Sequence, residues 1–396
     1  MAIAFPEPLL NGSARTRPAG VPNGDRIPLC RPTVPDSEAL IDEFRDIIAS
    51  GVLTNGPRVR EFERRASDYL GVRHCIAVSS CTSGLMLVLR AAELSGDVIV
   101  PSFTFAATAH AVSWCGLRPV FADIDPETLT LSLSAALRAI GMRTSAILAT
   151  HTYGVPCDVD GLTAIAERNG IRLFFDAAHA FGSRRGDTPV GGFGDAEVFS
   201  LSPTKVVVAA EGGLIATNED VLAERCRIGR DYGNPGDYDC RFVGLNARLS
   251  EFHAALGAAS LTGLDERIEY RNALATWYRE ELSDVPGLTF PSIPEGSRST
   301  YKDLTILIDR DLFGISAAEL GSRLAESGIE TRRYFDPPVH VMRAYQSLRA
   351  GNGHLPITER VASQVISLPL WGGLTRTDVL RVTAAVRDAQ SLVQAG

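Results

Sequence analysis

Residues 200–213 read SLSPTKVVVAAEGG and place Lys205 on a short connection between two apolar stretches, residues 196–201 and 212–216. This pattern predicts two buried strands with the lysine between them. An amine in apolar surroundings has a lowered pKa, because burial disfavours the charged ammonium, and the neutral amine can form a Schiff base with an aldehyde or ketone. An exposed loop lysine is the commoner case for a single lysine, so the rest of the chain has to decide between the two interpretations.

Strands and helices alternate on both sides of this segment. Continuous apolar strands between amphipathic helices are typical of an α/β fold with a mostly parallel central sheet covered on both faces. Ligands of such sheets gather at the carboxyl ends of the strands. The predicted strands are residues 75–79, 98–101, 119–123, 145–151 and 171–175, and the predicted helices are residues 37–50, 59–70, 85–92, 106–114, 132–140, 159–169, 219–230, 250–261 and 265–282.

The 396-residue chain is long enough for two domains. A stretch rich in Pro and Ser at residues 286–299 marks a connection. We therefore expect an N-terminal arm at residues 1–25, a large domain at 26–285 and a smaller C-terminal α+β domain at 286–396. The smaller domain is predicted to contain strands at residues 303–308 and 329–333 and helices at 316–327 and 377–394.

Composition limits the classes of partner. The chain has 45% hydrophobic and 22% charged residues and a net charge of −8, which is typical of a soluble globular protein and argues against nucleic acid as the main partner. No membrane-spanning run is seen, and residues 1–20 lack the basic start and apolar core of a signal peptide, so we expect a cytoplasmic protein without a membrane partner. The seven cysteines and seven histidines show no ligand spacing, so neither a metal site nor a disulfide framework is predicted.

Residues 80–84, SCTSG, lie between a predicted strand and a predicted helix. That geometry points backbone N–H groups at an anion, although such a sequence is more often a simple turn. Asp176 closes a buried strand, where a charge needs either a cationic partner or a role as a helix cap. His151 and His179 fit core histidines hydrogen-bonded to the backbone as readily as functional ones.

A lysine, a carboxylate, an aromatic ring and an anion-binding turn at four strand ends together fit pyridoxal 5'-phosphate (PLP). The cofactor aldehyde needs an amine, and its ring nitrogen keeps a proton only beside a carboxylate. Its phosphate needs N–H and hydroxyl donors, and its flat ring packs on an aromatic face.

A series of motifs follows in order through residues 27–388, nearly the whole chain. They are VLTNG (52–56), SCTSGL (80–85), PSFTFAAT (101–108), HTYG (151–154), DAAH (176–179), SLSPTK (200–205), EGG (211–213), GLNAR (244–248), PVH (338–340) and SLP (367–369). Through these motifs the chain resembles the DegT/StrS-type sugar aminotransferases, a group of the fold type I PLP-dependent enzymes. The resemblance implies a large domain with a mostly parallel sheet plus a smaller C-terminal domain.

Carried over by position, the resemblance implies roles around the cofactor ring. Lys205 would be the catalytic residue that forms the Schiff base with PLP, and Asp176 would pair with the ring nitrogen. Phe105 would stack on the ring. His179 would lie near the ring oxygen.

The resemblance also implies residues for the phosphate and the substrate. The phosphate would be bound by Thr82, Ser83 and Ser200. Asn246 and Arg248 would reach the phosphate of the partner subunit, so that each site of a homodimer needs two chains. Substrate would be bordered by Tyr334 and His340.

Three positions depart from the usual family pattern. Cys81 replaces a glycine in the phosphate turn, Ser202 replaces a bulkier residue, and residues 301–303 stand near a position that often carries histidine. Lys205 separates the chain from the deoxysugar dehydratase branch, in which a histidine takes that place. These departures bear on the identity of the sugar more than on the cofactor.

We therefore predict a PLP-dependent aminotransferase that converts a nucleotide-linked keto-deoxysugar to an amino sugar, with glutamate as the amino donor. A keto-cyclitol of an aminoglycoside pathway is the nearest alternative substrate. A PLP-binding regulator or scaffold without turnover is an alternative of a different class.

Overall fold

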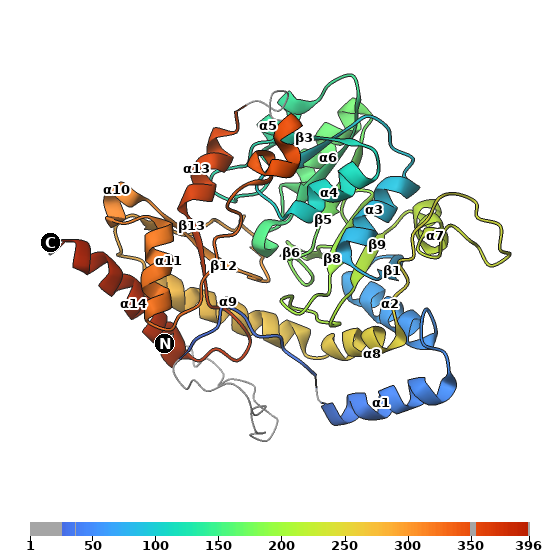
Figure 1. The fold of residues 1–396 in the computed structure, drawn as a ribbon, viewed down its shortest axis with the longest axis horizontal. Helices are drawn as coiled ribbons and strands as arrows, with labels where there is room; N and C mark the ends of the chain where they lie inside the picture. The colour runs from blue at the N-terminus through green and yellow to red at the C-terminus, as the bar shows by residue number, and fades with distance from the viewer. Residues whose placement is uncertain (1–25, 36, 349–353, 395–396) are drawn as a thin grey trace.

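The computed structural model describes residues 26–35, 37–348 and 354–394, so the predicted arm at residues 1–25 lies outside the described residues. A seven-stranded sheet with the order β1-β9-β8-β5-β4-β2-β3 forms the centre of the fold (Figure 1). β9 runs antiparallel to both its neighbours and the other neighbouring pairs are parallel, which confirms the mostly parallel sheet. The strands are β1 (His74–Val78), β2 (Asp97–Pro101), β3 (Arg118–Ala122), β4 (Thr144–Thr150), β5 (Arg172–Asp176), β8 (Ala196–Ser200) and β9 (Gly213–Thr217).

Helices cover both faces of this sheet. Side chains alternate along each strand, so Ala146 and Leu148 of β4 join the core on one face, and Ile147 and Ala149 join the core on the other. One face packs against α3 (Cys81–Ala91), α4 (Ala106–Trp114) and α7 (Asp220–Gly229). The other packs against α2 (Pro57–Leu70), α5 (Leu133–Ala139), α6 (Val159–Asn169) and α8 (Glu251–Ser260). α1 (Ser37–Ser50) lies against α8.

The helix after β1 begins earlier than the sequence predicts. α3 starts at Cys81, so the predicted turn at residues 80–84 is wrong and most of it forms the first helical turn. The cause is a capping box: Ser80 Oγ accepts from the backbone N–H of Ser83 at 3.0 Å, and Ser83 Oγ accepts from the N–H of Ser80 at 3.1 Å. The helix N-terminus therefore lies directly at the end of β1.

A second core lies beside the sheet, on the left in Figure 1. Its three-stranded antiparallel sheet has the order β10-β12-β13, with β10 (Leu288–Thr289), β12 (Leu304–Ile308) and β13 (Val365–Leu368). Its helices are α10 (Arg310–Phe313), α11 (Ala317–Glu326) and α14 (Arg376–Gln394), and α13 (Pro356–Gln364) lies against β12. The predicted strand at residues 329–333 is wrong, because Ile329 and Arg332 make isolated bridges and β13 takes the place beside β12.

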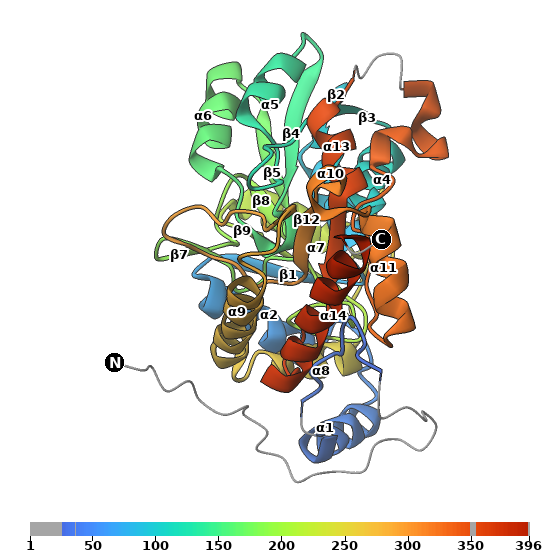
Figure 2. The ribbon, with the colours of Figure 1, turned by 90° about the vertical axis from the view of Figure 1, so that its left-hand side faces the viewer.

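α9 (Leu264–Glu281) runs along the lower side of the large sheet in Figure 1 and lies beside α14 in Figure 2. Its first half contributes Leu264 and Ile268 to the large core, and its second half contributes Leu274 and Tyr278 to the small one. A short sheet of β6 (Arg184–Arg185), β7 (Thr188–Pro189) and β11 (Ser297–Arg298) adds a further link between the two. The domain boundary at residues 285 and 286 stays a prediction. None of the described helices combines the length and apolar character needed to cross a membrane.

Candidate active site

A pocket of about 320 Å³ opens at the carboxyl ends of β1, β5 and β8, where the parallel strands direct their last side chains. Most of the predicted site residues line it. They are Thr82, Phe105, Asp176, His179, Ser200, Lys205 and Tyr334. Ser83, Asn246, Arg248 and His340 are described residues that lie outside this lining.

Asp176 is the last residue of β5 and is buried, with 4% of its surface exposed. Its Oδ2 accepts from Thr108 Oγ1 at 2.7 Å and its Oδ1 accepts from the N–H of Ala178 at 3.1 Å. Burial raises the pKa of this carboxyl, although both hydrogen bonds oppose the rise. The alternative role as a helix cap is not realised, because a turn follows β5 instead of a helix.

Lys205 lies on the connection between β8 and β9, as predicted. Burial of its amine and, to a lesser extent, the nearby ammonium of Lys302 lower its pKa to about 8. At pH 7 about a tenth of such amines is neutral, against less than about one in a thousand for an ordinary lysine. The Lys205 amine is therefore available as a nucleophile and as a base.

His179 is held as a neutral imidazole. Its Nδ1 accepts from the backbone N–H of Tyr153 at 3.2 Å, which places the ring proton on Nε2 and leaves Nε2–H as a donor. Burial lowers the pKa of His179 well below its usual value, and the ammonium groups of Lys205 and Lys302 act in the same direction. Its ring also stacks on Phe335, with the centroids 6.2 Å apart.

The N-terminus of α3 forms one side of the pocket. Thr82 on its first turn and Ser200 at the end of β8 both line the pocket. Gly213 of β9 allows the close approach of the two segments, since a Cβ atom there would lie 2.6 Å from the backbone nitrogen of Cys81. Ser83 instead uses its hydroxyl in the capping box with Ser80, so it positions the helix end.

Phe105 is the N-cap residue of α4 and is 62% exposed, although it lines the pocket. A large aromatic side chain that remains this exposed beside a pocket offers a flat face to a planar ligand.

Asn246 and Arg248 lie on a separate part of the surface. Arg248 donates to Asp231 Oδ1 at 2.7 Å and to Asn246 Oδ1 at 3.3 Å, and its guanidinium lies 5.4 Å from the centre of the Tyr232 ring. The two residues are thus held together but do not reach the pocket of their own chain.

Tyr334 lines the pocket and its carbonyl accepts from the hydroxyl of Tyr153. His340 is buried beyond the pocket and donates or accepts at both ring nitrogens. Its Nδ1 lies 2.6 Å from Ser102 Oγ, and its Nε2 lies 3.1 Å from Glu359 Oε1. Since its backbone N–H also donates to Ser102 Oγ at 2.9 Å, His340 fastens its loop to the large sheet.

Two charged residues of the pocket wall, Lys302 and Asp303, belong to the segment 301–303 that the sequence singles out, but their place in this pocket is not predicted. They precede β12 of the small sheet, and only 6% and 7% of their surfaces are exposed. The signal that could have found them is a charged pair at the start of an otherwise apolar strand.

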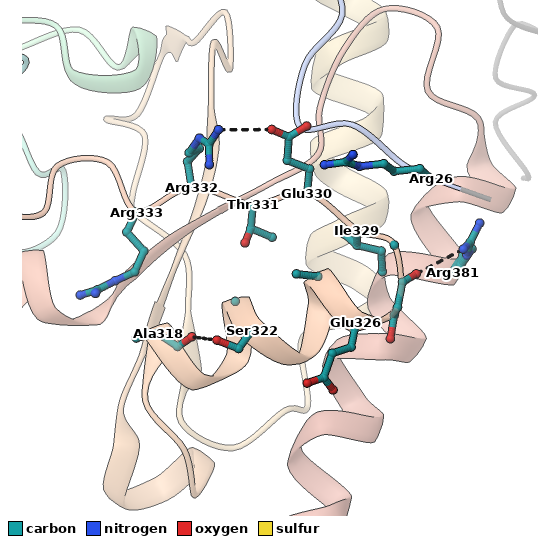
Figure 3. Close-up of a pocket in the computed structure, with 14 residues that line it drawn as sticks. Arg26, Ala318, Ser322, Glu326, Ile329, Glu330, Thr331, Arg332, Arg333 and Arg381 are labelled. Atoms are coloured by element: carbon teal, nitrogen blue, oxygen red, sulfur yellow. Dashed lines mark hydrogen bonds and ion pairs between the residues drawn. The ribbon is translucent and has the colours of Figure 1, made fainter. Parts of the chain in front are cut away.

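A larger hollow of about 940 Å³ lies on the outer side of the small core (Figure 3). Two of its arginines contact protein groups: Arg332 contacts Glu330 at 3.4 Å, and Arg381 donates to the carbonyl of Ser327 at 3.3 Å. This hollow shares no lining residue with the Lys205 pocket among the described residues.

The groups in the Lys205 pocket fit PLP by their chemistry. A buried carboxylate with a raised pKa gains most from a cationic neighbour, such as a protonated ring nitrogen, and Asp176 is such a group. Lys205 supplies a partly neutral amine, and the end of α3 supplies N–H and hydroxyl donors for a phosphate.

Comparison with known proteins agrees with this geometry. The model of the DegT/DnrJ/EryC1/StrS aminotransferase family matches residues 35–387. The erythromycin biosynthesis sensory transduction protein EryC1 of Saccharopolyspora erythraea is 38% identical over 87% of this chain and 93% of its own length. A GDP-perosamine synthase of Caulobacter vibrioides is 35% identical over 84% of this chain and 90% of its own length.

The crystal structure of DesI in the presence of its TDP-sugar product superposes with a TM-score of 0.89 at 38% identity, covering 94% of this chain and 95% of that chain. The predicted fold type I architecture, PLP as cofactor and aminotransferase class are thereby confirmed. The chain belongs to the DegT/DnrJ/EryC1/StrS aminotransferase family, whose members depend on PLP.

Proposed function

We propose that this protein transfers an amino group from glutamate to a nucleotide-linked keto-deoxysugar, and that it works as a homodimer in the cytoplasm. The observation that carries the proposal is the meeting of Lys205, Asp176 and the N-terminus of α3 around one pocket. The DesI relative was solved with a TDP-sugar product and the Caulobacter relative is named a GDP-perosamine synthase, which supports a nucleotide-linked sugar as the substrate.

PLP, when bound, supplies an aldehyde that takes up the amino group and a ring that withdraws electrons from the reacting carbon. Asp176 would keep a proton on the ring nitrogen, because its buried carboxylate stabilises an adjacent cation. The Lys205 amine would remove the proton from the carbon that carries the amino group and return a proton in the opposite half of the reaction. Its pKa of about 8 suits both tasks near neutral pH. His179 would donate from Nε2 to the ring oxygen.

Thr82, Ser200 and the first N–H groups of α3 would bind the phosphate of the cofactor. Asn246 and Arg248 are exposed or half-buried and already hydrogen-bonded to each other, so they form a preorganised polar group on the surface. We propose that this group completes the phosphate site of the second subunit.

The test uses the purified protein loaded with PLP. Glutamate should change the visible absorbance of the bound cofactor, and a panel of nucleotide-linked keto-sugars and keto-cyclitols, read by product mass, should identify the amino acceptor. Lys205→Ala should abolish both half-reactions, whereas Lys205→Ala that still turns over would refute the mechanism. Amination of keto-cyclitols alone would replace the nucleotide sugar as substrate.

A PLP-binding regulator without turnover is the competing function, and it is favoured by the name of the EryC1 relative, a sensory transduction protein. Binding of PLP without any change on addition of glutamate would support that function.

A further inference from the structure

Lys302 and Asp303 form a buried ion pair in the wall of the Lys205 pocket. Lys302 Nζ lies 2.8 Å from Asp303 Oδ1, and the two side chains are 5% and 4% exposed. The ammonium also lies 5.5 Å from the centre of the Tyr334 ring. A buried ion pair is costly to maintain unless every polar atom is satisfied, so its incomplete pairing calls for an explanation.

The pairing is incomplete on both partners. Asp303 Oδ2 is buried and has no hydrogen-bond partner among the described residues. An ammonium has three N–H donors, and Asp303 takes one of those of Lys302. An acceptor without a partner and an ammonium with donors that Asp303 does not take therefore belong to two adjacent residues of the pocket lining.

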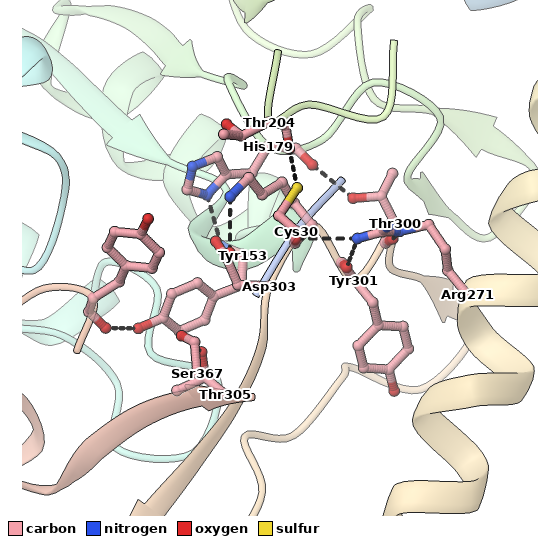
Figure 4. A network of polar contacts seen from close by, with 12 residues as sticks. Cys30, Tyr153, His179, Thr204, Arg271, Thr300, Tyr301, Asp303, Thr305 and Ser367 are labelled. Atoms are coloured by element: carbon pink, nitrogen blue, oxygen red, sulfur yellow. Dashed lines mark hydrogen bonds and ion pairs between the residues drawn. The ribbon is translucent and has the colours of Figure 1, made fainter. Parts of the chain in front are cut away.

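Hydrogen bonds fix the backbone around the pair, and Figure 4 draws this network. The buried guanidinium of Arg271 on α9 donates to the carbonyls of Thr300 at 3.0 Å and of Lys302 at 3.1 Å. Thr300 Oγ1 donates to the carbonyl of His179 at 2.6 Å, which ties the segment to the large sheet. The pair is thus preorganised before any ligand enters.

Both lysines of the chain lie in this pocket, whereas all other cationic side chains that count among its Lys and Arg residues are arginines. Of the 39 lysine and arginine residues, all but Lys205 and Lys302 are arginines, and both lysines line this pocket. An ammonium is a compact donor, whereas a guanidinium is a wide planar fork. The compact group leaves room for a ligand beside Lys205.

We propose that Lys302 and Asp303 together bind one hydroxyl group of the keto-sugar beside its reacting carbonyl, and so determine which sugar is accepted. The inference rests on the proposed function. A hydroxyl can donate to Asp303 Oδ2 and accept from Lys302 Nζ at once. A carboxylate or phosphate could only accept, and would leave Asp303 facing a second anion. The carboxylates of the amino donor therefore bind elsewhere.

Asp303→Asn is the matched test. Because Lys302 can only donate, the amide must turn its oxygen to Lys302 and its NH₂ to the pocket, so an acceptor becomes a donor at unchanged size. The variant should raise the KM for a dTDP-linked 4-keto-6-deoxyhexose by about 10- to 100-fold, the range of a lost hydrogen bond to a charged group. Cofactor loading and the absorbance change with glutamate should stay as in the wild type.

Sugar analogues that each lack one hydroxyl test the same contact from the side of the ligand. One analogue should bind the wild type as weakly as the parent sugar binds Asp303→Asn, and the variant should lose nothing further with it. Lys302→Arg should not restore sugar binding, although it keeps the charge. Asp309→Asn, the same change at the exposed far end of β12, is the control for general effects on folding.

The outcomes separate the two proposals. An active wild type whose Asp303→Asn variant keeps its sugar KM, or loses the glutamate half-reaction equally, would overturn the inference and leave the proposed function intact. A wild type that binds and converts no keto-sugar would overturn the proposed function and this inference with it.

Discussion

Asp176→Asn tests the electrostatic basis of the site, because it removes a buried charge and keeps the shape of the side chain. The carboxylate accepts from Thr108 Oγ1 at 2.7 Å and from the N–H of Ala178 at 3.1 Å. In the variant the amide oxygen must stay on Ala178, and the NH₂ then faces Thr108 Oγ1. That hydroxyl can accept and turn its own proton to Thr104 Oγ1, which lies 2.9 Å away. Both contacts of residue 176 therefore survive.

The charge does not survive, and activity should fall with it. Removing one partner of a buried ion pair costs about 3 to 5 kcal/mol, which corresponds to about 100- to 3000-fold in rate. Rapid mixing with glutamate, followed by the absorbance of the bound cofactor, measures the loss. Thr108→Val keeps the charge of Asp176 and removes one hydrogen bond, so its rate should fall by only about 10-fold.

The same substitution, Asp176→Asn, should keep or raise the stability of the cofactor-free protein, although it lowers activity. Burial raises the pKa of Asp176, so the folded state binds its proton more tightly than the unfolded chain does. Stability contributed by this group therefore falls as pH rises through the raised pKa, because the charged form is then buried without a cation. Asp176→Asn should unfold at an equal or higher temperature than the wild type at neutral pH, and the gain should shrink in acid. A cofactor-free variant that unfolds earlier, or a loaded variant with the wild-type rate, would refute the reasoning.

Three further outcomes follow from the same contacts. The rate at which the cofactor-free protein binds PLP should rise with pH around a midpoint of about 8, where the Lys205 amine loses its proton. Lys302→Met should move this midpoint upward, because it removes a repelling charge. A midpoint that does not move would contradict this role of Lys302. Mixed dimers of Asn246→Ala and Lys205→Ala subunits should regain about one working site, which activity titration would show, whereas inactive mixtures would exclude a shared site. Glu251 accepts from the N–H groups of three residues at the start of α2, at 2.8, 2.8 and 3.0 Å, so Glu251→Gln should lose about 1 to 3 kcal/mol in urea unfolding, and an unchanged midpoint would contradict the role of this cap.

The sequence predicts the pocket residues proposed for the cofactor well, because each of them lies at or shortly after the end of a buried strand. Asp176 and Ser200 are the last residues of β5 and β8, and Lys205 follows β8 directly. Parallel strands with apolar sequences are recognisable one by one, and their carboxyl ends must meet at one edge. Local pattern is therefore enough to bring these side chains together.

Local sequence pattern does not predict features that depend on contacts between distant parts of the chain or on an uncommon residue in a motif. Ser83 stays a predicted phosphate ligand, but local pattern does not show that its hydroxyl also caps α3, because serine takes the position at which a capping box usually carries Glu or Gln. The strand β13 (Val365–Leu368) is missed since its partner β12 lies far away in the sequence. Lys302 and Asp303 are missed as pocket residues because they reach the pocket from the small sheet, through the packing of α9.

The residues proposed to bind the cofactor and the pair proposed to bind the sugar are held by different parts of the fold. This difference fits their different proposed roles. The groups proposed for the cofactor stand on strands and helix ends of one sheet, so their positions are common to any chain that folds in this way. The Lys302 and Asp303 pair depends on one buried arginine, Arg271, and on contacts between two cores. Exchange of Lys302 and Asp303 alone would change the polarity of one wall and keep the contact of Thr300 with the carbonyl of His179. Variation in the accepted sugar can therefore arise here without loss of the amino-transfer chemistry.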